Sequence, residues 1–327
     1  MSGEFAYEEV RCCPVCACEK RREVFVGHDD RYGHPDVYPL VECTECGLAY
    51  LATRPMEKYV PELYRRYYSS PSVGPDHLSR GILTWCKERL KATVIWLIHQ
   101  KIANPTNLYT KVTHVRDKAI LDVGSGSVLA AASWVLRHGG RWASLEANEQ
   151  VCAYLNRHGF SCYQQTLEQF SRSTPERFDY IVLSQVLEHV YHPVEFLKAA
   201  LCLLKKGGSI IMSCPNYDSV FRTRYGTKWL HWHIPYHVSQ FNRGSLEVLL
   251  QRVGLSIVEW KTVTPSAWFR AQRSLVDGER FSDTSIKSHL MLQLYLNARL
   301  WPVNEAGHGD AIITALSPKL NGTHANI

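Results

Sequence analysis

The stretch ILDVGSG, residues 120–126, decides the fold class of this chain. Its apolar, β-branched start predicts a buried strand, and its two glycines predict a tight turn before a helix. An acidic residue, Glu146, closes the next strand-like segment twenty positions after Gly126. In a doubly wound sheet, such glycines let the backbone approach a ligand, and such an acid binds ribose hydroxyls. The pattern therefore predicts a site for an adenosine-containing cofactor.

The residues that follow continue an alternation of strands and helices. The aromatic and β-branched run 178–184 predicts a second buried strand, followed by a loop and by a helix over 193–204. The cationic and glycine residues 205–208 predict the end of that helix, and residues 209–214 predict a further strand closed by Pro215. This order predicts an α/β protein with a doubly wound, mostly parallel sheet.

The motifs of this region resemble the class I S-adenosylmethionine-dependent methyltransferases. The glycine strand, the ribose acid, FDYIVLSQVLEHV at 178–190 and LLKKGGSIIMSCPN at 203–216 follow one another in that family's order. The resemblance covers residues 118–218 and extends more loosely to 316. It implies a Rossmann-like sheet of seven strands, S-adenosylmethionine as the cofactor, and methyl transfer as the reaction. Residues 309–316 resemble the antiparallel strand that completes such a sheet.

The resemblance also implies which residues contact the cofactor. The matching positions are Asp122, Gly124 and Gly126 near the methionine end, Glu146 at the ribose, Leu167 and Glu168 near the adenine, and Ser184 at the end of the second strand. Two positions depart from the family pattern: Val128 replaces a third glycine, and Thr166 replaces a common acid. We expect Val128 to pack under the helix. The alternative is that it blocks the cofactor and leaves a catalytically silent binding protein.

The amino-terminal region is rich in cysteine, with six of the eleven cysteines between positions 12 and 46. Two CxxC pairs can each present two thiolates to one tetrahedral ion: Cys13 with Cys16, and Cys43 with Cys46. Four thiolates close the coordination shell, so the pairs predict structural zinc. A redox pair is the alternative, but no thioredoxin-like βαβ pattern surrounds either CxxC. This spacing leaves Cys12 and Cys18 as free thiols.

We therefore expect residues 9–52 to form a zinc ribbon, with short strands at 24–26 and 38–41. This CPxC and CxxCGL module resembles one that precedes the methyltransferase domain in enzymes that modify activated sugars and natural products. Ala17 replaces the glycine that usually follows the first CxxC.

The remaining segments have less specific patterns. Residues 53–110 are expected to be a helical linker, and apolar spacing over 82–102 predicts an amphipathic helix. Packing of that helix on the sheet is favoured over a lid on the cofactor cleft or a surface that stacks on bases. The methyltransferase domain is placed at 111–318, with an insertion at 262–308 that selects the acceptor or contacts a second copy in a homodimer. A polar tail, 319–327, follows.

Three histidines, His231, His233 and His237, occur within seven residues. The loop that holds them contains no carboxylate, which argues against a metal site there. Histidine accepts protons near neutral pH, as methyl transfer to a hydroxyl requires. The loop resembles an HxxxF segment in which sugar methyltransferases place a catalytic histidine, and the match implies His237 as the general base. The expected walls of the acceptor site are Glu188, His189, His233 and Tyr236, the last standing where many relatives carry a glutamate.

Composition narrows the expected partners. The net charge of +6 allows an acidic small-molecule acceptor without requiring nucleic acid. No apolar run reaches eighteen residues, and the first residues lack the apolar core of a leader, so we expect a cytoplasmic protein without a membrane span. The expected function is methyl transfer to a hydroxyl of a nucleotide-linked sugar, a glycan or a natural-product scaffold. An RNA methyltransferase is the alternative, although acidic pairs flank the cationic run 20–22 of the cysteine module.

Overall fold

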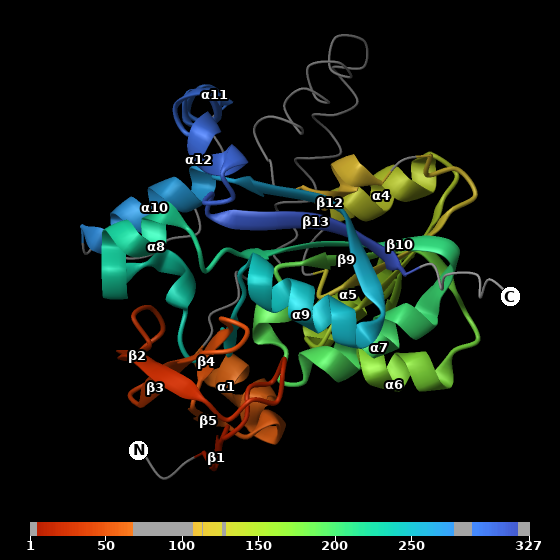
Figure 1. Cartoon of the computed structure of the whole chain (residues 1–327). Helices are drawn as coiled ribbons and strands as arrows, with labels where there is room; N and C mark the ends of the chain where they lie inside the picture. The colour runs from red at the N-terminus through yellow and green to blue at the C-terminus, as the bar shows by residue number, and fades with distance from the viewer. Residues whose placement is uncertain (1–4, 68–106, 113, 126–128, 278–289, 320–327) are drawn as a thin grey trace, which may run out of the picture.

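The computed structural model describes residues 5–67, 107–112, 114–125, 129–277 and 290–319 (Figure 1). Four of the sequence predictions lie outside these residues: the cofactor contact of Gly126, the packing of Val128, the helix over 82–102, and the polar tail beyond residue 319.

The centre of the molecule is a seven-stranded sheet with the order β12-β13-β10-β9-β6-β7-β8. Its strands are β6 (Ala119–Val123), β7 (Arg141–Leu145), β8 (Ser161–Tyr163), β9 (Phe178–Ser184), β10 (Leu204–Pro215), β12 (Leu255–Val263) and β13 (Ala311–Pro318). The strands from β8 to β10 are parallel, and β13 is antiparallel to both of its neighbours. All five residues of β6 are buried, as expected for a parallel strand that is covered on both faces. The predicted Rossmann-like fold class is confirmed.

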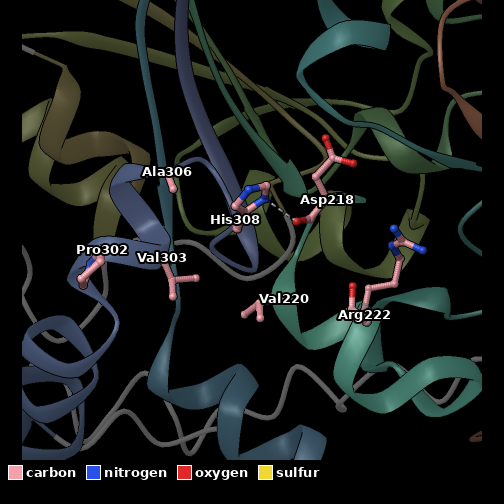
Figure 2. Close-up of a pocket in the computed structure, with 8 residues that line it drawn as sticks. Asp218, Val220, Arg222, Pro302, Val303, Ala306 and His308 are labelled. Atoms are coloured by element: carbon pink, nitrogen blue, oxygen red, sulfur yellow. Dashed lines mark hydrogen bonds between the residues drawn. The ribbon is translucent and has the colours of Figure 1, made fainter.

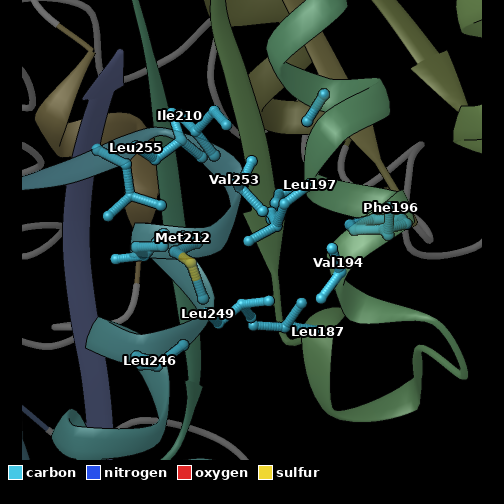
Figure 3. Close-up of a cluster of buried hydrophobic side chains, with 14 of the residues drawn as sticks. Leu187, Val194, Phe196, Leu197, Ile210, Met212, Leu246, Leu249, Val253 and Leu255 are labelled. Atoms are coloured by element: carbon cyan, nitrogen blue, oxygen red, sulfur yellow. The ribbon is translucent and has the colours of Figure 1, made fainter. Parts of the chain in front are cut away.

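Helices cover both faces of this sheet (Figure 1). One face packs against α6 (Leu167–Ser173), α7 (Pro193–Leu203) and α9 (Arg243–Val253), and the other against α4 (Leu129–Arg137), α5 (Glu149–Arg157) and the short helix η2 (Leu108–Lys111). Figure 3 shows Met212 of β10 beside Leu249 of α9, with Leu197 of α7 nearby. Each such buried side chain contributes roughly 1.5–3 kcal/mol relative to exposure, so this apolar layer holds the strand ends in place.

The predicted helix over 193–204 matches α7 to within one residue, but the prediction that residues 205–208 form its end was wrong. Helix α7 ends at Leu203, and β10 begins at Leu204 with an irregular register up to Ser209. A Cβ on Gly208 would lie 3.0 Å from the carbonyl oxygens of Lys205 and Phe178, so this glycine allows the close approach of two strand backbones. Lys205 forms an ion pair with Asp179 of β9 (Nζ–Oδ2 2.6 Å) rather than neutralising a helix end.

The amino-terminal module is built from short antiparallel strands. They are β1 (Tyr7–Glu9), β2 (Arg21–His28), β3 (Val37–Cys43), β4 (Ala49–Leu51) and β5 (Thr53–Pro55). Strand β1 pairs with β5, and β2, β3 and β4 form a second sheet whose fourth strand is β11 (Ser239–Gln240). Because β11 directly follows the histidine loop, defined here as residues 229–238, that loop is hydrogen-bonded through β11 to the amino-terminal module. The short helices η1 (Glu57–Tyr59) and α1 (Val60–Arg66) follow β5.

The residues between β12 and β13 form a helical group beside α8 (Figure 1). The described helices of this group are α10 (Ser266–Val276), α11 (Leu290–Arg299) and α12 (Trp301–Glu305), whereas α8 (Val220–Tyr225), η4 (Gly226–Lys228) and η5 (Leu230–Trp232) come from the segment between β10 and β11. Gln272 of α10 accepts a hydrogen bond from the Leu230 backbone N–H (2.7 Å) and donates one to the Lys228 carbonyl (2.8 Å). The inserted helices therefore support the first part of the histidine loop. Among the described helices, none has the length and apolar character that a bilayer crossing requires.

Candidate functional site

The four predicted zinc ligands meet in one cluster, called here the four-cysteine cluster (Cys13, Cys16, Cys43 and Cys46). The Sγ atoms of Cys13 and Cys46 are 3.5 Å apart, those of Cys16 and Cys43 are 3.4 Å apart, and all four lie within 4.8 Å of one another. Thiolates bonded to one tetrahedral zinc at about 2.3 Å stand roughly 3.8 Å apart, so the donor set and its geometry fit the ion.

Tight turns produce this convergence. Gly47 has a left-handed backbone (φ +74°), and its N–H donates to the Cys43 carbonyl (3.0 Å). The N–H of Ala17 likewise donates to the Cys13 carbonyl (2.9 Å). Ala17 therefore adopts the left-handed conformation (φ +63°) that a glycine usually supplies at this position, at some cost in backbone strain. Cys12 and Cys18 lie outside the cluster, as predicted.

Neighbouring thiols in the cluster share protons. A hydrogen bond with Cys46 lowers the pKa of Cys13 to about 5, and the same contact, together with burial, raises the pKa of Cys46 well above its usual range. One member therefore gives up its proton easily, as the first step of metal binding requires.

The glycine turn after β6 lies against the loop that follows β9. Gly124 has φ +67°, and its N–H donates to the Leu145 carbonyl (2.8 Å). A Cβ at this position would lie 3.1 Å from Val186 Cγ2, so Gly124 satisfies both a left-handed turn and a close contact. The next residue, Ser125, bonds through its Oγ to the Oγ of Ser144 (2.5 Å). The predicted cofactor turn and the loop after β9 are thus direct neighbours.

Asp122 is buried beneath this turn. Its Oδ2 accepts a hydrogen bond from the Tyr109 hydroxyl (2.5 Å), which itself accepts one from Trp142 Nε1 (2.8 Å). Burial raises the pKa of Asp122 to about 7, although the bond from Tyr109 lowers it. Sequence reasoning missed Tyr109, because its segment has no recognisable motif. The cofactor contact assigned to Asp122 stays a prediction.

Glu146 and Ser184 lie at the ends of the two strands that flank β6: Glu146 directly follows β7, and Ser184 is the last residue of β9. The Oε1 of Glu146 accepts from the backbone N–H of Asn148 (3.0 Å), the N-cap of α5. Ser184 is exposed. Both lie at the carboxyl edge of the sheet, the edge where doubly wound folds bind ligands.

The two residues predicted near the adenine stand at the start of α6. Leu167 is buried in the core, whereas Glu168 is partly exposed. Thr166 caps the helix, accepting from Gln169 N–H (3.2 Å) while the Gln169 side chain accepts from Thr166 N–H (3.1 Å). This capping box accounts for a threonine where the family often has an acid.

Two histidines and a glutamate converge beside the sheet edge, in a group called here the glutamate-histidine cluster (Glu188, His189 and His237). Glu188 and His189 belong to the short helix η3 (Leu187–His189) after β9, and His237 comes from the histidine loop. The imidazole rings of His189 and His237 are 4.7 Å apart at their centroids, with their planes near perpendicular. One ligand-type atom from each of the three residues lies within 4.8 Å of the other two.

Both imidazoles are oriented by backbone carbonyls. Nδ1 of His189 lies 2.9 Å from the Tyr236 carbonyl oxygen, and Nδ1 of His237 lies 2.8 Å from that of His231. Because a carbonyl only accepts, each Nδ1 carries the proton and each Nε2 keeps its lone pair. Burial lowers the pKa of His189 to about 4 and that of His237 well below its usual range, so both rings are neutral at pH 7.

Glu188 has no such support. Its side chain is 1% exposed, and neither carboxylate oxygen has a hydrogen-bond partner in another described residue. Burial raises its pKa to about 8, although its own backbone N–H opposes the shift. A buried polar group left without a partner costs roughly 1–3 kcal/mol, which makes this carboxyl an unusual feature of the core.

The other predicted wall residues surround this cluster. His233 has a left-handed backbone (φ +41°), and its Nδ1 is 3.2 Å from His237 Nε2. The Tyr236 ring packs edge-on against Tyr64 of α1, whose hydroxyl is 2.9 Å from His189 Nδ1. Tyr64 is a contact that sequence reasoning missed, because α1 was expected to be part of a linker.

The remaining histidine of the loop, His231, has a different partner. Its Nε2 lies 3.3 Å from Oδ2 of the buried Asp310. Burial raises the pKa of Asp310, but His231 and the hydrogen bonds from Ser219 and Trp229 lower it overall. Asp310 thereby anchors the loop from the start of β13, so the three histidines do not act as one group.

An open cavity of about 570 Å³ lies elsewhere, between α8 and the end of α12 (Figure 2). Val220, Val303 and Pro302 form part of its lining, and His308 Nδ1 is 3.0 Å from the Asp218 carbonyl at its rim. None of the predicted site residues lines it.

Residues 98–260 match the model of a family described as a methyltransferase domain. This segment, about half of the chain, is a methyltransferase domain, and it contains the glycine turn, η3 and the histidine loop.

Curated relatives align over about a third of the chain. A ubiquinone biosynthesis O-methyltransferase of Serratia proteamaculans (strain 568) is 29% identical over 109 residues, which are 32% of this chain and 45% of that protein. The protein of the same name from Azotobacter vinelandii (strain DJ / ATCC BAA-1303) is 30% identical over 121 residues, or 35% and 52%. The chain thus spans about half the length of the curated relatives it matches.

Solved structures give a similar picture at lower identity. An S-adenosylmethionine-dependent methyltransferase from Mesorhizobium loti is 17% identical, with a TM-score of 0.46, covering 65% of this chain and 97% of that one. An O-methyltransferase from a trans-AT PKS multienzyme of Brevibacillus brevis, in complex with S-adenosyl-L-homocysteine, is 15% identical, with a TM-score of 0.46, covering 76% and 81%.

Proposed function

We propose that this chain transfers the methyl group of S-adenosylmethionine to a hydroxyl of a small molecule, such as a nucleotide-linked sugar, a glycan or a natural-product scaffold. One observation carries the proposal. Val186 of the loop after β9 packs on Gly124 of the predicted cofactor turn, two residues before the buried Glu188 and three before the partly buried His189. A methyl donor on the turn and an acceptor at the glutamate-histidine cluster would therefore be neighbours. The O-methyltransferase names of the curated relatives favour oxygen as the acceptor atom.

The reaction is an in-line displacement. The acceptor oxygen forms a bond to the methyl carbon while the carbon–sulfur bond breaks and its electron pair remains on sulfur. The hydroxyl proton goes to Nε2 of His237, the nitrogen whose lone pair is left by the contact of Nδ1 with the His231 carbonyl. Alignment of the two reactants contributes roughly 7–11 kcal/mol to lowering the barrier, more than a general base, which is worth about 10²–10⁴-fold.

The chain's own residues would supply three further conditions. Glu146 would bind the ribose hydroxyls at the end of β7, and Gly124 would let the backbone approach the methionine end. The enclosure of His237, which is 6% exposed, would limit the access of water to the reacting groups. The four-cysteine cluster would hold zinc as a structural ion, because its shell is closed and leaves no position for a substrate.

Calorimetry with S-adenosylmethionine, combined with labelled methyl transfer onto metabolite extracts, tests the proposal. Glu146→Gln should weaken cofactor binding by about tenfold, because one charge-assisted hydrogen bond is replaced by a weaker one. His237→Ala should keep the cofactor affinity and lower turnover, whereas His192→Ala, at an exposed histidine, should change neither. A wild-type chain that does not bind the cofactor would contradict the proposal, and an unchanged rate in His237→Ala would remove the proton transfer from that residue.

A further inference from the structure

The glutamate-histidine cluster has the composition of a metal site with open coordination positions. Its three ligand-type atoms lie within 4.8 Å of one another, on two loops that meet at the sheet edge. We infer that Glu188, His189 and His237 bind a divalent transition-metal cation, in addition to the ion expected in the four-cysteine cluster. An ion bonded at about 2.1 Å to each atom needs separations of roughly 3 to 4 Å, so small side-chain rotations complete the set.

The buried carboxyl group is the independent observation that points to a ligand. Glu188 is almost fully enclosed, and no other described residue donates a hydrogen bond to either oxygen. A fold that buries a carboxyl group normally supplies a donor or a cation for it. The side chains closest to this carboxyl in the cluster, His189 and His237, present unprotonated Nε2 atoms, which are acceptors rather than donors. A cation satisfies all three groups at once, because carboxylate and neutral imidazole are both metal ligands.

The contacts of Nδ1 add the support that a metal-binding histidine usually has. A metal-bound imidazole commonly donates its other N–H to a carbonyl or carboxylate, which fixes the ring and the tautomer. The carbonyl oxygens of Tyr236 and His231 occupy these positions for His189 and His237. Cation binding exchanges the 3.2 Å contact between His237 Nε2 and His233 Nδ1 for a bond to the ion. The two rings therefore need little reorganisation to become ligands.

Two imidazoles and one carboxylate suit zinc, iron or cobalt and leave further positions for an oxygen ligand. This inference deepens the proposed function and rests on it for the role of the ion: an acceptor hydroxyl bound there would lose its proton more easily. One lone pair cannot hold both an ion and a proton. In this form of the mechanism His237 is thus a ligand, and the hydroxyl releases its proton to solvent as it binds the ion, before the bound acceptor closes the site to water.

Cobalt(II) binding to the full-length chain tests the inference without any assay of activity. After dialysis against cobalt(II), elemental analysis of the wild-type chain should find two ions per chain. Glu188→Gln and His237→Asn should each retain one ion, with the intense thiolate-to-metal charge-transfer absorption of the four-cysteine cluster unchanged. Glu195→Gln and His192→Gln exchange an exposed glutamate and an exposed histidine close in sequence, and both should keep two ions.

The outcomes separate this inference from the proposed function. A single ion in the wild-type chain, or two ions in both cluster variants, overturns the inference even if the chain binds S-adenosylmethionine. Two ions in the wild type, one in each cluster variant and no cofactor binding by calorimetry would support the cation site and contradict the methyl transfer.

Discussion

The four-cysteine cluster and the glutamate-histidine cluster are both sets of converging side chains of the types that bind metals, but the chain assembles them differently. The first takes two ligands from each of two local turns, whose CxxC spacing is visible in the sequence. The second takes Glu188 and His189 from one loop and His237 from another, nearly fifty residues later. The first has four ligands and no open position, whereas the second has three. A site with four protein ligands from local turns has no position left for a substrate, which indicates a structural role. A site with three protein ligands that only tertiary contacts bring together leaves a coordination position open, which indicates a catalytic role.

Backbone hydrogen bonds connect the cysteine module to the glutamate-histidine cluster through the histidine loop. The Leu51 N–H of β4 donates to the Val238 carbonyl (3.1 Å), and the Val238 N–H donates to the Glu188 carbonyl (2.9 Å). The histidine loop is therefore held between the cysteine module and η3. Damage to the module should reach the second cluster, whereas a substitution at Glu188 should leave the first intact. The first prediction below tests this asymmetry, and the others test the glutamate-histidine cluster itself.

The largest effect is expected from Cys46→Ala. Apparent binding free energies of structural zinc are about 10–16 kcal/mol, so loss of one thiolate should unfold the module in most molecules. Because β4 then no longer pairs with β11, the second ion should be lost as well. Elemental analysis and limited proteolysis measure the two effects. Cys12→Ser, at an exposed thiol outside the cluster, should show neither, and a protease-resistant Cys46→Ala module would contradict the prediction.

A smaller effect is expected from Glu188→Gln in protein that holds an ion in the four-cysteine cluster only. The folded pKa of Glu188, about 8, exceeds the ordinary 4.5, so the native state keeps a proton that the unfolded state releases between these values. Wild-type stability should therefore fall as the pH rises from 4.5 to 8. The variant should be more stable than the wild type by roughly 5 kcal/mol above pH 8 and similar below pH 4.5.

Urea denaturation at several pH values measures this difference. Cys214, the buried thiol whose pKa is raised by burial and by Glu188, is present in both proteins. Glu195→Gln, at an exposed glutamate, should follow the wild type. Parallel curves for Glu188→Gln and the wild type would show that the carboxyl is not buried without a partner.

A comparable change in stability, but in the opposite direction of pH, is expected through His189. The folded pKa of His189, about 4, lies below the ordinary 6.5, so its contribution to stability is complete above pH 6.5 and is lost as the pH falls toward 4. The wild type should lose roughly 3 kcal/mol over this range through His189 alone. His189→Gln should flatten that part of the urea-denaturation profile, and His192→Gln should not. An equally steep profile in His189→Gln would contradict burial of a neutral ring.

The smallest effect is expected from Tyr64→Phe. The Tyr64 hydroxyl is 2.9 Å from His189 Nδ1, but the Tyr236 carbonyl still orients the ring when the hydroxyl is removed. Affinity for the second cobalt ion should fall by about tenfold, the lower end for loss of a supporting contact. Tyr59→Phe, at a partly buried tyrosine of the same module, is the control for general packing. A loss of the second ion as complete as in Glu188→Gln would make Tyr64 itself part of the metal site.

Much of the fold could be predicted from local pattern. The apolar runs at 120–123 and 178–183 are buried strands, because a parallel strand covered on both faces needs continuous apolar residues. The prediction at 205–208 was wrong because glycine has two uses, in a helix end and in the close approach of two backbones, and the sequence does not distinguish them. Thr166 departs from the family pattern because it is the N-cap of α6, a role that a match to the family's motifs does not show.

The sequence by itself determined the elements that depend on near neighbours along the chain: the glycine turn after β6, and the two CxxC turns whose thiolates meet. Only the tertiary structure decided that β11 joins β4, that His231 pairs with Asp310, and that Glu188 and His189 lie beside His237. The physical reason is the range of the forces involved. Turn geometry and periodic burial act over a few residues, whereas a site made by two loops exists only after the sheet has brought the carboxyl ends of its strands together.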